Sequence, residues 1–294
     1  MLSRIITKAK DLGFLKIGFS KPERPVYFDR YYTWISENKH ADMSWLERNI
    51  DKRENSGRLL RGCRTIISLA YPYPSHRPVN PDGLCVSRYS QPGLEDYHFR
   101  LKRLCRDLGV IIRELYAGSR IKICVDSAPI LEKSVAASSG IGFTGKNTLL
   151  IIPDHGSYFY LAEILTTALL EFPQTEPAEC RCDSCTLCVE SCPTGALEKP
   201  FLLDASKCLS FLSIEYKGDK YCEDGKKMGD CFFGCDRCQA ICPFNEGEES
   251  QQISLPSTNE FLRMGEEDFQ TRFGKTTLAR AGLEKIKKNI RAIV

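Results

Sequence analysis

The spacing of the cysteines constrains this chain more than any other feature of its sequence. The first set is Cys182, Cys185, Cys188 and Cys192, followed by Pro193. This is the Cys-x2-Cys-x2-Cys-x3-Cys-Pro pattern that two-cluster bacterial ferredoxins use to hold iron–sulfur clusters. A second set, Cys235, Cys238, Cys242 and then Pro243, repeats the pattern with its first ligand displaced, and Cys208 is the candidate to replace that ligand.

The two sets together predict two [4Fe–4S] clusters. Three closely spaced thiolates reach three corners of one cluster, and the fourth cysteine of each set serves the other cluster. We therefore expect one cluster on Cys182, Cys185, Cys188 and Cys242. We expect the other on Cys192, Cys208, Cys235 and Cys238.

Structural zinc is the alternative interpretation of these cysteines, because paired cysteines commonly bind tetrahedral zinc. Zinc sites normally present two pairs separated by a loop. Here three cysteines follow at steps of three, and a Cys-Pro step closes each set. This spacing favours iron–sulfur clusters.

The number of cysteines and the start of the chain indicate the compartment. No apolar run is long enough to cross a bilayer, and charges interrupt the first residues, MLSRIITKAK, where a secretion signal would be apolar. We expect a cytoplasmic protein with no membrane partner. Reductants keep thiols reduced there, so 15 cysteines point to metal ligation rather than disulfides.

Composition excludes several other classes of protein. The chain has 294 residues, 42% of them hydrophobic and 27% charged, which is ordinary globular composition rather than that of a disordered or fibrous chain. A net charge of +3 is too small to indicate a nucleic-acid binder. Basic runs at 48–64 and 272–294 are either solvated faces or places where a phosphate backbone rests.

The distribution of cysteines also divides the chain. Four are scattered singly through the first 179 residues, and the other eleven lie between Cys180 and Cys242. The proline-bearing stretch 171–179 at this change resembles a linker. We expect a catalytic α/β domain at 1–175, a two-cluster ferredoxin-like domain at 176–248 and a helical basic tail at 249–294.

Short apolar runs predict the core of the first domain. Strands are expected at 65–71, 122–126 and 157–167, and a helix at 96–115. Pro129 suits the first turn of a further helix, and Gly140 suits its end. This alternation predicts an α/β core, in which ligands bind beyond the carboxyl ends of strands. In the tail, apolar residues at 278, 283, 286 and 290 predict one or two amphipathic helices.

Two features of the first domain are candidates for chemistry. Cysteine-saturated clusters relay electrons but leave no open coordination position, so the reaction must occur elsewhere. The glycine-rich turn at 140–147 carries Lys146 and Asn147 and suits a cofactor, although glycines after a helix are commonly C-caps. No dinucleotide-type turn or Walker loop is present.

Asp126 ends the expected strand at 122–126 and has two interpretations. It either caps the helix that begins near Pro129 or, with a raised pKa, donates a proton. Of the histidines, only His98, in an Asp-Tyr-His triplet, lies among other candidate residues.

These motifs in this order resemble the epoxyqueuosine reductase family. The similarity rests on VDSAPILEKSVAASSGIGFTGKNTLLI, GSYFYLAEILTT, CDSCTLCVESCPTGAL, LDASKCLSFLSIEYKG and FFGCDRCQAICPFN, and it extends from about the first strand to Asn245. The resemblance implies a nitroreductase-like α/β domain that binds cobalamin. It also implies reduction of the epoxide of epoxyqueuosine at the tRNA wobble position, with electrons passing through the two clusters to cobalt.

The resemblance also implies roles for particular residues. Asp126 would be the proton donor over the corrin. The implied cofactor contacts are Arg88, Tyr89, Ser90, Asp126, Gly145, Lys146, Asn147, Leu150, Glu163 and Ser210. The implied tRNA contacts are Tyr216, Lys217 and Gly218. The implied partners are tRNA carrying epoxyqueuosine and an external low-potential electron donor, and we expect a monomer.

The chain departs from the family pattern at three places. A motif of the type RYxxGxDYH appears as RYSQPGLEDYH, with extra residues, and Phe143 stands where tryptophan is common. Longer relatives carry a C-terminal helical-repeat domain, and this chain ends before it, so we expect a short form. The basic tail is then a candidate for tRNA binding.

Two other functions stay open on the sequence. A cobalamin-dependent reductive dehalogenase shares both kinds of cofactor, although the twin-arginine signal typical of that class is not at the start of this chain. A ferredoxin-type electron-transfer protein would use the first domain only as a scaffold. A flavin in place of cobalamin is also compatible with the composition.

Overall fold

The structure, a computed structural model, describes residues 1–74, 76–218, 227–245 and 250–294. The chain forms two compact units. Unit 1 contains residues 1–72, 97–145 and 149–183, and unit 2 contains 73–96, 146–148 and 184–294. The segments 73–96 and 146–148 therefore belong to the same unit as most of the cysteine-rich part of the chain.

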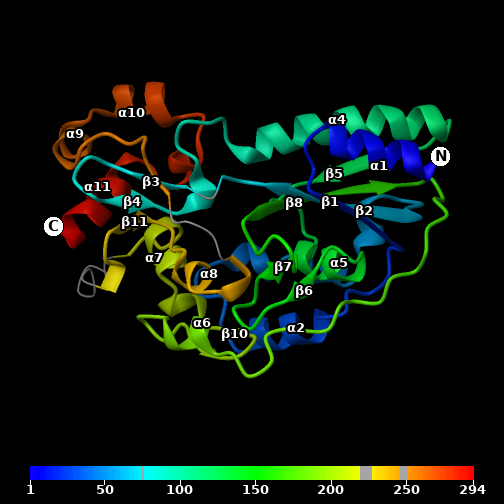
Figure 1. The fold of residues 1–294 in the computed structure, drawn as a ribbon, viewed down its shortest axis with the longest axis horizontal. Helices are drawn as coiled ribbons and strands as arrows, with labels where there is room; N and C mark the ends of the chain where they lie inside the picture. The colour runs from blue at the N-terminus through cyan, green and yellow to red at the C-terminus, as the bar shows by residue number, and fades with distance from the viewer. Residues whose placement is uncertain (75, 219–226, 246–249) are drawn as a thin grey trace. The chain divides into compact units, whose positions relative to one another are not determined.

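Unit 1 is built on a four-stranded sheet with the order β1-β2-β8-β5 (Figure 1). Every pairing is antiparallel. Because β8 lies between β2 and β5 and pairs antiparallel with both, those two strands run in the same direction. The strands are β1 Lys16–Ser20, β2 Thr65–Pro72, β5 Ile121–Cys124 and β8 Phe159–Thr166.

Helices cover both faces of this sheet. Side chains alternate along β8, so Tyr160 faces helix α4, where its ring stacks on Tyr97. Leu165, on the opposite face, packs beside Val135 of helix α5. The helices of unit 1 are α1 Leu2–Asp11, α2 Phe28–Ser36, α3 Ile50–Glu54, α4 Tyr97–Leu115 and α5 Glu132–Ser138. A small hairpin joins β6 Phe143–Thr144 and β7 Leu150–Ile151.

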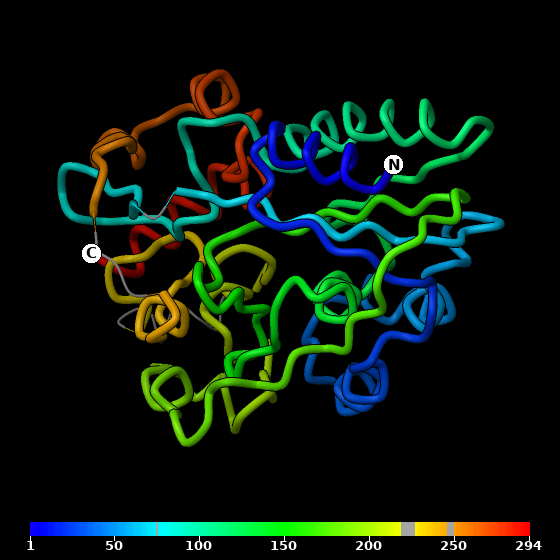
Figure 2. The backbone as a smooth tube through the Cα atoms, turned by 45° about the vertical axis from the view of Figure 1, so that its right-hand side comes forward, coloured from blue at the N-terminus to red at the C-terminus, as the bar shows by residue number. Residues whose placement is uncertain are grey.

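The expected strands at 65–71, 122–126 and 157–167 and the expected helix at 96–115 are all present. The expected helix start near Pro129 is wrong, because α5 begins at Glu132 with Leu131 as its N-cap. Gly140 ends the helix as expected, with φ of 73° and its N–H bonded to Ala137 O. Residues 169–182 have no regular structure, and Figure 2 shows them as an extended run along unit 1.

Unit 2 contains a smaller mixed sheet with the order β11-β4-β3-β12. Its strands are β3 Arg77–Val79, β4 Cys85–Val86, β11 Cys231–Phe233 and β12 Gln251–Ile253. A second hairpin pairs β9 Leu197–Lys199 with β10 Leu202–Leu203. Its short helices are α6 Leu187–Glu190, α7 Leu209–Ile214 and α8 Arg237–Ala240.

The C-terminal tail forms the apolar core of unit 2. It contains helices α9 Thr258–Arg263, α10 Glu266–Phe273 and α11 Leu283–Ile293. Phe261, Phe269 and Ile286 are fully buried in one cluster with Phe232 of β11. The expectation of an amphipathic helix at the end of the chain is confirmed, because α11 buries Leu283, Ile286 and Ile290, and Leu278 lies in a 3-10 turn just before it. In the part of the chain that the structure describes, no helix is both long and apolar enough to cross a bilayer.

Candidate active site and electron-transfer module

Asp126 lies two residues beyond the end of β5. Its φ of 56° is left-handed, a conformation that aspartate and asparagine adopt more readily than most residues. Its Oδ2 lies 3.0 Å from His98 Nε2, and about half of the Asp126 side chain is exposed. The interpretation of Asp126 as a helix cap is wrong, because Leu131 is the N-cap of α5 and no side chain caps that position.

An aromatic stack extends from His98 within unit 1. The ring of Tyr97 stacks on His98, with 4.1 Å between ring centroids, and on Tyr160, with 4.3 Å. The Arg100 guanidinium lies 5.4 Å from the ring centroid of Tyr71 and 5.8 Å from that of Tyr160. Arg100 Nε is buried and has no hydrogen-bond partner among the described residues. The stack therefore presents a carboxylate, an imidazole and an unmatched donor on neighbouring elements.

Glu132, in the first turn of α5, binds the Asp126 backbone, and the sequence analysis missed it. Its Oε1 accepts a hydrogen bond from Asp126 N–H at 2.6 Å. Burial, and next the charge of Asp126, raise the pKa of Glu132. A glutamate in the first helical turn is common for electrostatic reasons alone, so the sequence carried no signal for this contact.

Glu163 is fully buried near the middle of β8. Burial and the neighbouring Glu132 raise the pKa of its carboxyl. The resemblance predicts Glu163 as a cofactor contact, which stays a prediction. Leu150, another predicted contact, is buried in β7, and Gly145 N–H donates to Leu149 O where the 146–148 turn begins.

The cysteines of unit 2 influence one another's pKa values. Burial, and then Cys242 and Cys185, raise the pKa of Cys188. Burial, and then Cys235 and Cys208, raise the pKa of Cys238, and burial raises that of Cys208 with a smaller contribution from Cys192. Cys188, from the other expected set, also raises the pKa of Cys238, so these interactions do not separate the two sets and the ligand assignment stays a prediction. Cys182 falls within unit 1.

Lys146 and Asn147 contact the backbone beside these cysteines. Lys146 Nζ donates to Cys185 O at 2.8 Å, and Asn147 Nδ2 donates to Cys238 O at 3.2 Å. Cys185 and Cys238 belong to different expected clusters, so one short turn holds a loop of each. The contact of Lys146 and Asn147 with cobalamin stays a prediction.

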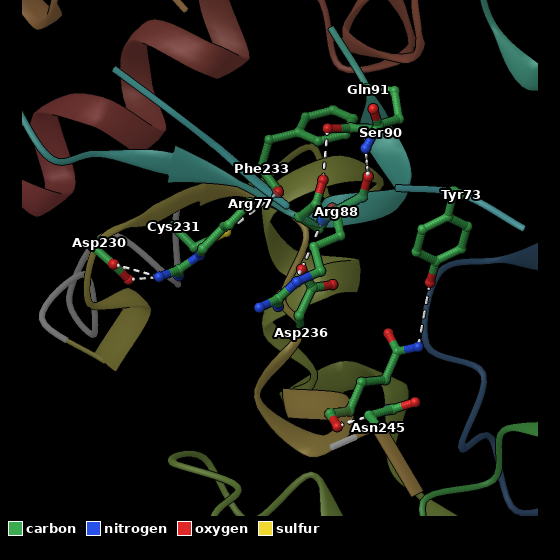
Figure 3. Close-up of polar contacts among 12 residues, drawn as sticks. Tyr73, Arg77, Arg88, Ser90, Gln91, Asp230, Cys231, Phe233, Asp236 and Asn245 are labelled. Atoms are coloured by element: carbon green, nitrogen blue, oxygen red, sulfur yellow. Dashed lines mark hydrogen bonds and ion pairs between the residues drawn. The ribbon is translucent and has the colours of Figure 1, made fainter. Parts of the chain in front are cut away.

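The turn η3, Arg88–Ser90, is fixed by the loop that carries the second cysteine set (Figure 3). Arg88 N–H donates to Asp236 Oδ2 at 2.7 Å, and the Arg88 guanidinium lies 3.7 Å from the same oxygen. Ser90 Oγ donates to Ser87 O at 2.7 Å, and the Tyr89 ring packs against Phe233. Arg88 and Ser90 are buried, so their polar groups serve this turn.

The segment predicted to touch tRNA is held by the tail. Lys285 Nζ donates to Tyr216 O and lies 5.6 Å from the centroid of its ring. Arg280 Nε donates to Glu215 Oε1 at 2.6 Å. Lys217 is exposed, and a Cβ at Gly218 would collide with the Tyr216 hydroxyl, so a larger residue there would require the Tyr216 ring to move. Ser210, a predicted cofactor contact, is half-buried on α7.

The remaining cysteines differ in exposure. Cys180 is exposed, whereas Cys105, Cys124 and Cys231 are buried. Cys222 lies outside the described residues.

Among the described residues, no three His, Cys, Asp or Glu side chains converge closely enough to hold a single metal ion.

The cysteine-rich segment matches a known family of domains. Residues 181–245 match the family model described as a 4Fe-4S double cluster binding domain. The chain is therefore an iron–sulfur redox protein. Residues 53–127 match the model described as epoxyqueuosine reductase QueG, DUF1730.

The full-length comparisons agree with these two models. The chain is 32% identical to an epoxyqueuosine reductase of Pseudomonas aeruginosa over 296 residues, 96% of this chain and 81% of the relative. It therefore belongs to the epoxyqueuosine reductase family, whose members are oxidoreductases.

Solved structures of relatives share its fold. The structure of epoxyqueuosine reductase from Streptococcus thermophilus matches with a TM-score of 0.89 and 30% identity, over 100% of this chain and 80% of that one. A further epoxyqueuosine reductase, solved with an epoxyqueuosine-modified tRNA-Tyr stem loop, matches with a TM-score of 0.83 and 29% identity, over 99% and 80% of the two chains. These matches confirm the mixed α and β fold.

Proposed function

We propose that this protein reduces the epoxide of epoxyqueuosine in tRNA to give queuosine, using cobalamin that receives electrons through two [4Fe–4S] clusters. One observation carries the proposal: the chain that holds two sets of cluster cysteines also presents a half-exposed carboxylate, Asp126, paired with His98. Family membership supplies the substrate class, because a relative was solved with the modified stem loop. A tRNA substrate and an external low-potential donor suit a cytoplasmic enzyme.

The residues present fit both cofactors. Eight cysteines in two sets are the donor set that two cubane clusters require, and each cluster, when bound, supplies one-electron redox capacity. For cobalamin, the unmatched Nε of Arg100 suits a peripheral amide oxygen, and the stack of Tyr97 on His98 suits a flat macrocycle. Cobalamin, when bound, supplies a reduced cobalt able to open an epoxide.

Asp126 and His98 handle the protons of the reaction. Removing the epoxide oxygen as water consumes two electrons and two protons. Asp126 donates a proton to the oxygen as its bond to carbon breaks, so that oxygen does not leave as an unstable anion. His98 Nε2, 3.0 Å from the carboxylate, is placed to return a proton to it. Lys146 and Asn147 keep the cluster loops in place while the charge changes.

Tyr216, Lys217 and Gly218 supply a candidate tRNA contact. Lys217 offers an exposed cation for a phosphate, and Tyr216 offers a ring on which a base can stack. The link from Lys285 to Tyr216 makes the tail a support for this segment. This contact rests on the resemblance and on the chemistry of the three residues.

The test is anoxic reconstitution with iron, sulfide and cobalamin, followed by incubation with epoxyqueuosine-containing tRNA and nucleoside analysis. Wild-type protein should form queuosine. Asp126→Asn should keep its iron and cobalamin but lose roughly 10²- to 10⁴-fold in rate, the usual contribution of a general acid.

Asp107→Asn, an exposed change on α4, is the matched control and should keep full activity. Full activity in Asp126→Asn would remove the acid assignment. Cobalamin uptake without queuosine formation would favour the dehalogenase alternative, and no uptake would favour a plain electron carrier.

A further inference from the structure

Glu163 occupies an unusual position for a charged residue. It lies inside the central sheet of unit 1, paired in register with Ser68 of β2 and Cys124 of β5. Its side chain is fully buried, and neither carboxyl oxygen has a hydrogen-bond donor among the described residues. A lone buried carboxylate is so costly that the group keeps a proton or finds a partner that has one.

The partner is Glu132 at the start of α5. Helix α5 packs against β8, Glu132 raises the pKa of Glu163, and Glu132 Oε1 accepts the Asp126 N–H at 2.6 Å. The three acidic residues thus form a row from the sheet interior to the half-exposed carboxylate of Asp126. At the outer end, His98 Nε2 lies 3.0 Å from Asp126 Oδ2.

We propose that Glu132 is a positioning residue for Asp126, and that Glu132 and Glu163 form a buried carboxyl pair that retains at least one proton at neutral pH. Glu132 fixes the left-handed backbone of Asp126 through its N–H and so aims the carboxylate. The proton lets two carboxyls lie together and keeps additional negative charge from building up behind Asp126. This role rests on the proposed function of Asp126 as the acid.

The groups around the pair support a retained proton. The titratable groups that interact electrostatically with the pair are Asp126 from the loop, His98 and Cys105 from α4, and Cys124 from β5. Asp126 raises the pKa of Glu132 and His98 lowers it by a smaller amount, after burial, which raises it most. Burial outweighs the smaller opposing effect of His98, so at least one carboxyl stays neutral.

The first test reads the backbone rather than activity. Hydrogen–deuterium exchange of the 124–131 segment is measured in the anoxically purified, cluster-loaded protein. Glu132→Leu should speed exchange at Asp126 N–H by roughly tenfold or more, because the amide loses its acceptor. Glu132→Gln keeps an acceptor and should stay within a few-fold of wild type.

The matched control is Ser138→Ala, at the other end of α5, which should leave exchange unchanged. The same ranking should appear in turnover: kcat falls strongly in Glu132→Leu and is largely rescued in Glu132→Gln, with KM for tRNA unchanged. Equal exchange in Glu132→Leu and wild type would overturn the positioning role.

The second test reads the proton directly. Infrared difference spectra of wild type minus Glu163→Gln at pH 7 should show a C=O stretching band of a protonated carboxyl that moves in D₂O. Absence of this band would overturn the retained proton. The exchange and infrared measurements report on unit 1 without turnover. Failure of Asp126 as the acid would appear only as full activity in Asp126→Asn, so it can be distinguished from failure of the carboxyl pair.

Discussion

The two units of this protein are stabilised by different means. Unit 1 has an eight-residue strand, β8, paired along both edges, with helices on each face. Unit 2 has strands of two or three residues, and side-chain hydrogen bonds to the backbone, such as Lys146 to Cys185 O, hold its cluster loops. The comparison teaches that apolar packing shapes the acid site, whereas bound iron and the tail helices must complete the redox module.

Removal of one cluster ligand should produce the largest difference between the units. Cys238→Ser is expected to lower iron from about eight to about four atoms per chain and to abolish queuosine formation, because one electron-transfer step is lost. Tryptophan fluorescence should stay native, since Trp34 and Trp45 both lie in unit 1. Iron analysis and emission spectra measure both effects.

The control for that experiment is the exposed Cys180. Cys180→Ser should retain all iron and full activity. A loss of iron in this variant equal to that in Cys238→Ser would contradict the ligand assignment.

Truncation of the core of the tail should weaken unit 2 alone. Phe261 is fully buried between Phe232 and Phe273, so Phe261→Ala should cost about 3–5 kcal/mol and lower the temperature at which cluster absorbance is lost. Leu108→Ala, an equally buried change on α4, should destabilise the tryptophan-reported transition instead. Identical shifts of both signals in both variants would show that the units unfold together.

The acid pair should make the stability of unit 1 depend on pH. Folding raises the pKa of Glu163, so the folded chain binds more protons than the unfolded chain between the ordinary value of 4.5 and the raised one. Stability therefore falls as pH rises through this window, by up to about 1.4 kcal/mol per pH unit for one proton. Glu163→Gln should flatten that slope, as urea titrations followed by tryptophan fluorescence at pH 5.5 and 7.5 will measure.

The smallest expected effect concerns the tail and tRNA. Lys285→Gln should weaken tRNA binding about fivefold, because the cation contact that steadies Tyr216 is lost. Lys287→Gln removes the same charge from a residue paired with Glu284 and is the control. Deletion of 272–294 is a poor test, because Leu278, Ile286 and Ile290 of that segment belong to the core of unit 2.

Much of unit 1 could be predicted from its sequence because its signals are local. The apolar run at 65–71 and the periodicity at 96–115 gave β2 and α4. The antiparallel pairing of β2 and β5 with β8 was not predictable, because pairing depends on residues about 40 to 100 positions apart. The short sheet of unit 2 carries too few residues to show alternation.

The candidate site was predictable where chemistry depends on spacing. The cysteine sets were predicted from their spacing, Asp126 from its place at the end of an expected strand and from the family resemblance, and His98 from its neighbours. Glu132 was missed because its importance comes from a single backbone contact. The contacts of Lys146 and Asn147 with cysteine carbonyls were also missed, since a glycine-rich turn does not reveal its partner.

The left-handed backbone at Asp126 restricts which substitutions are informative. Asparagine tolerates this region almost as well as aspartate does. An asparagine variant therefore removes the ionisable proton and keeps the backbone conformation of the loop. Alanine would add about 1–2 kcal/mol of steric strain. Its effect on the backbone could then not be separated from the loss of the carboxyl group. Protein engineers who vary this position therefore have a narrow choice of side chains: glycine relaxes the main chain, asparagine mimics the shape, and only aspartate satisfies both the turn and the reaction.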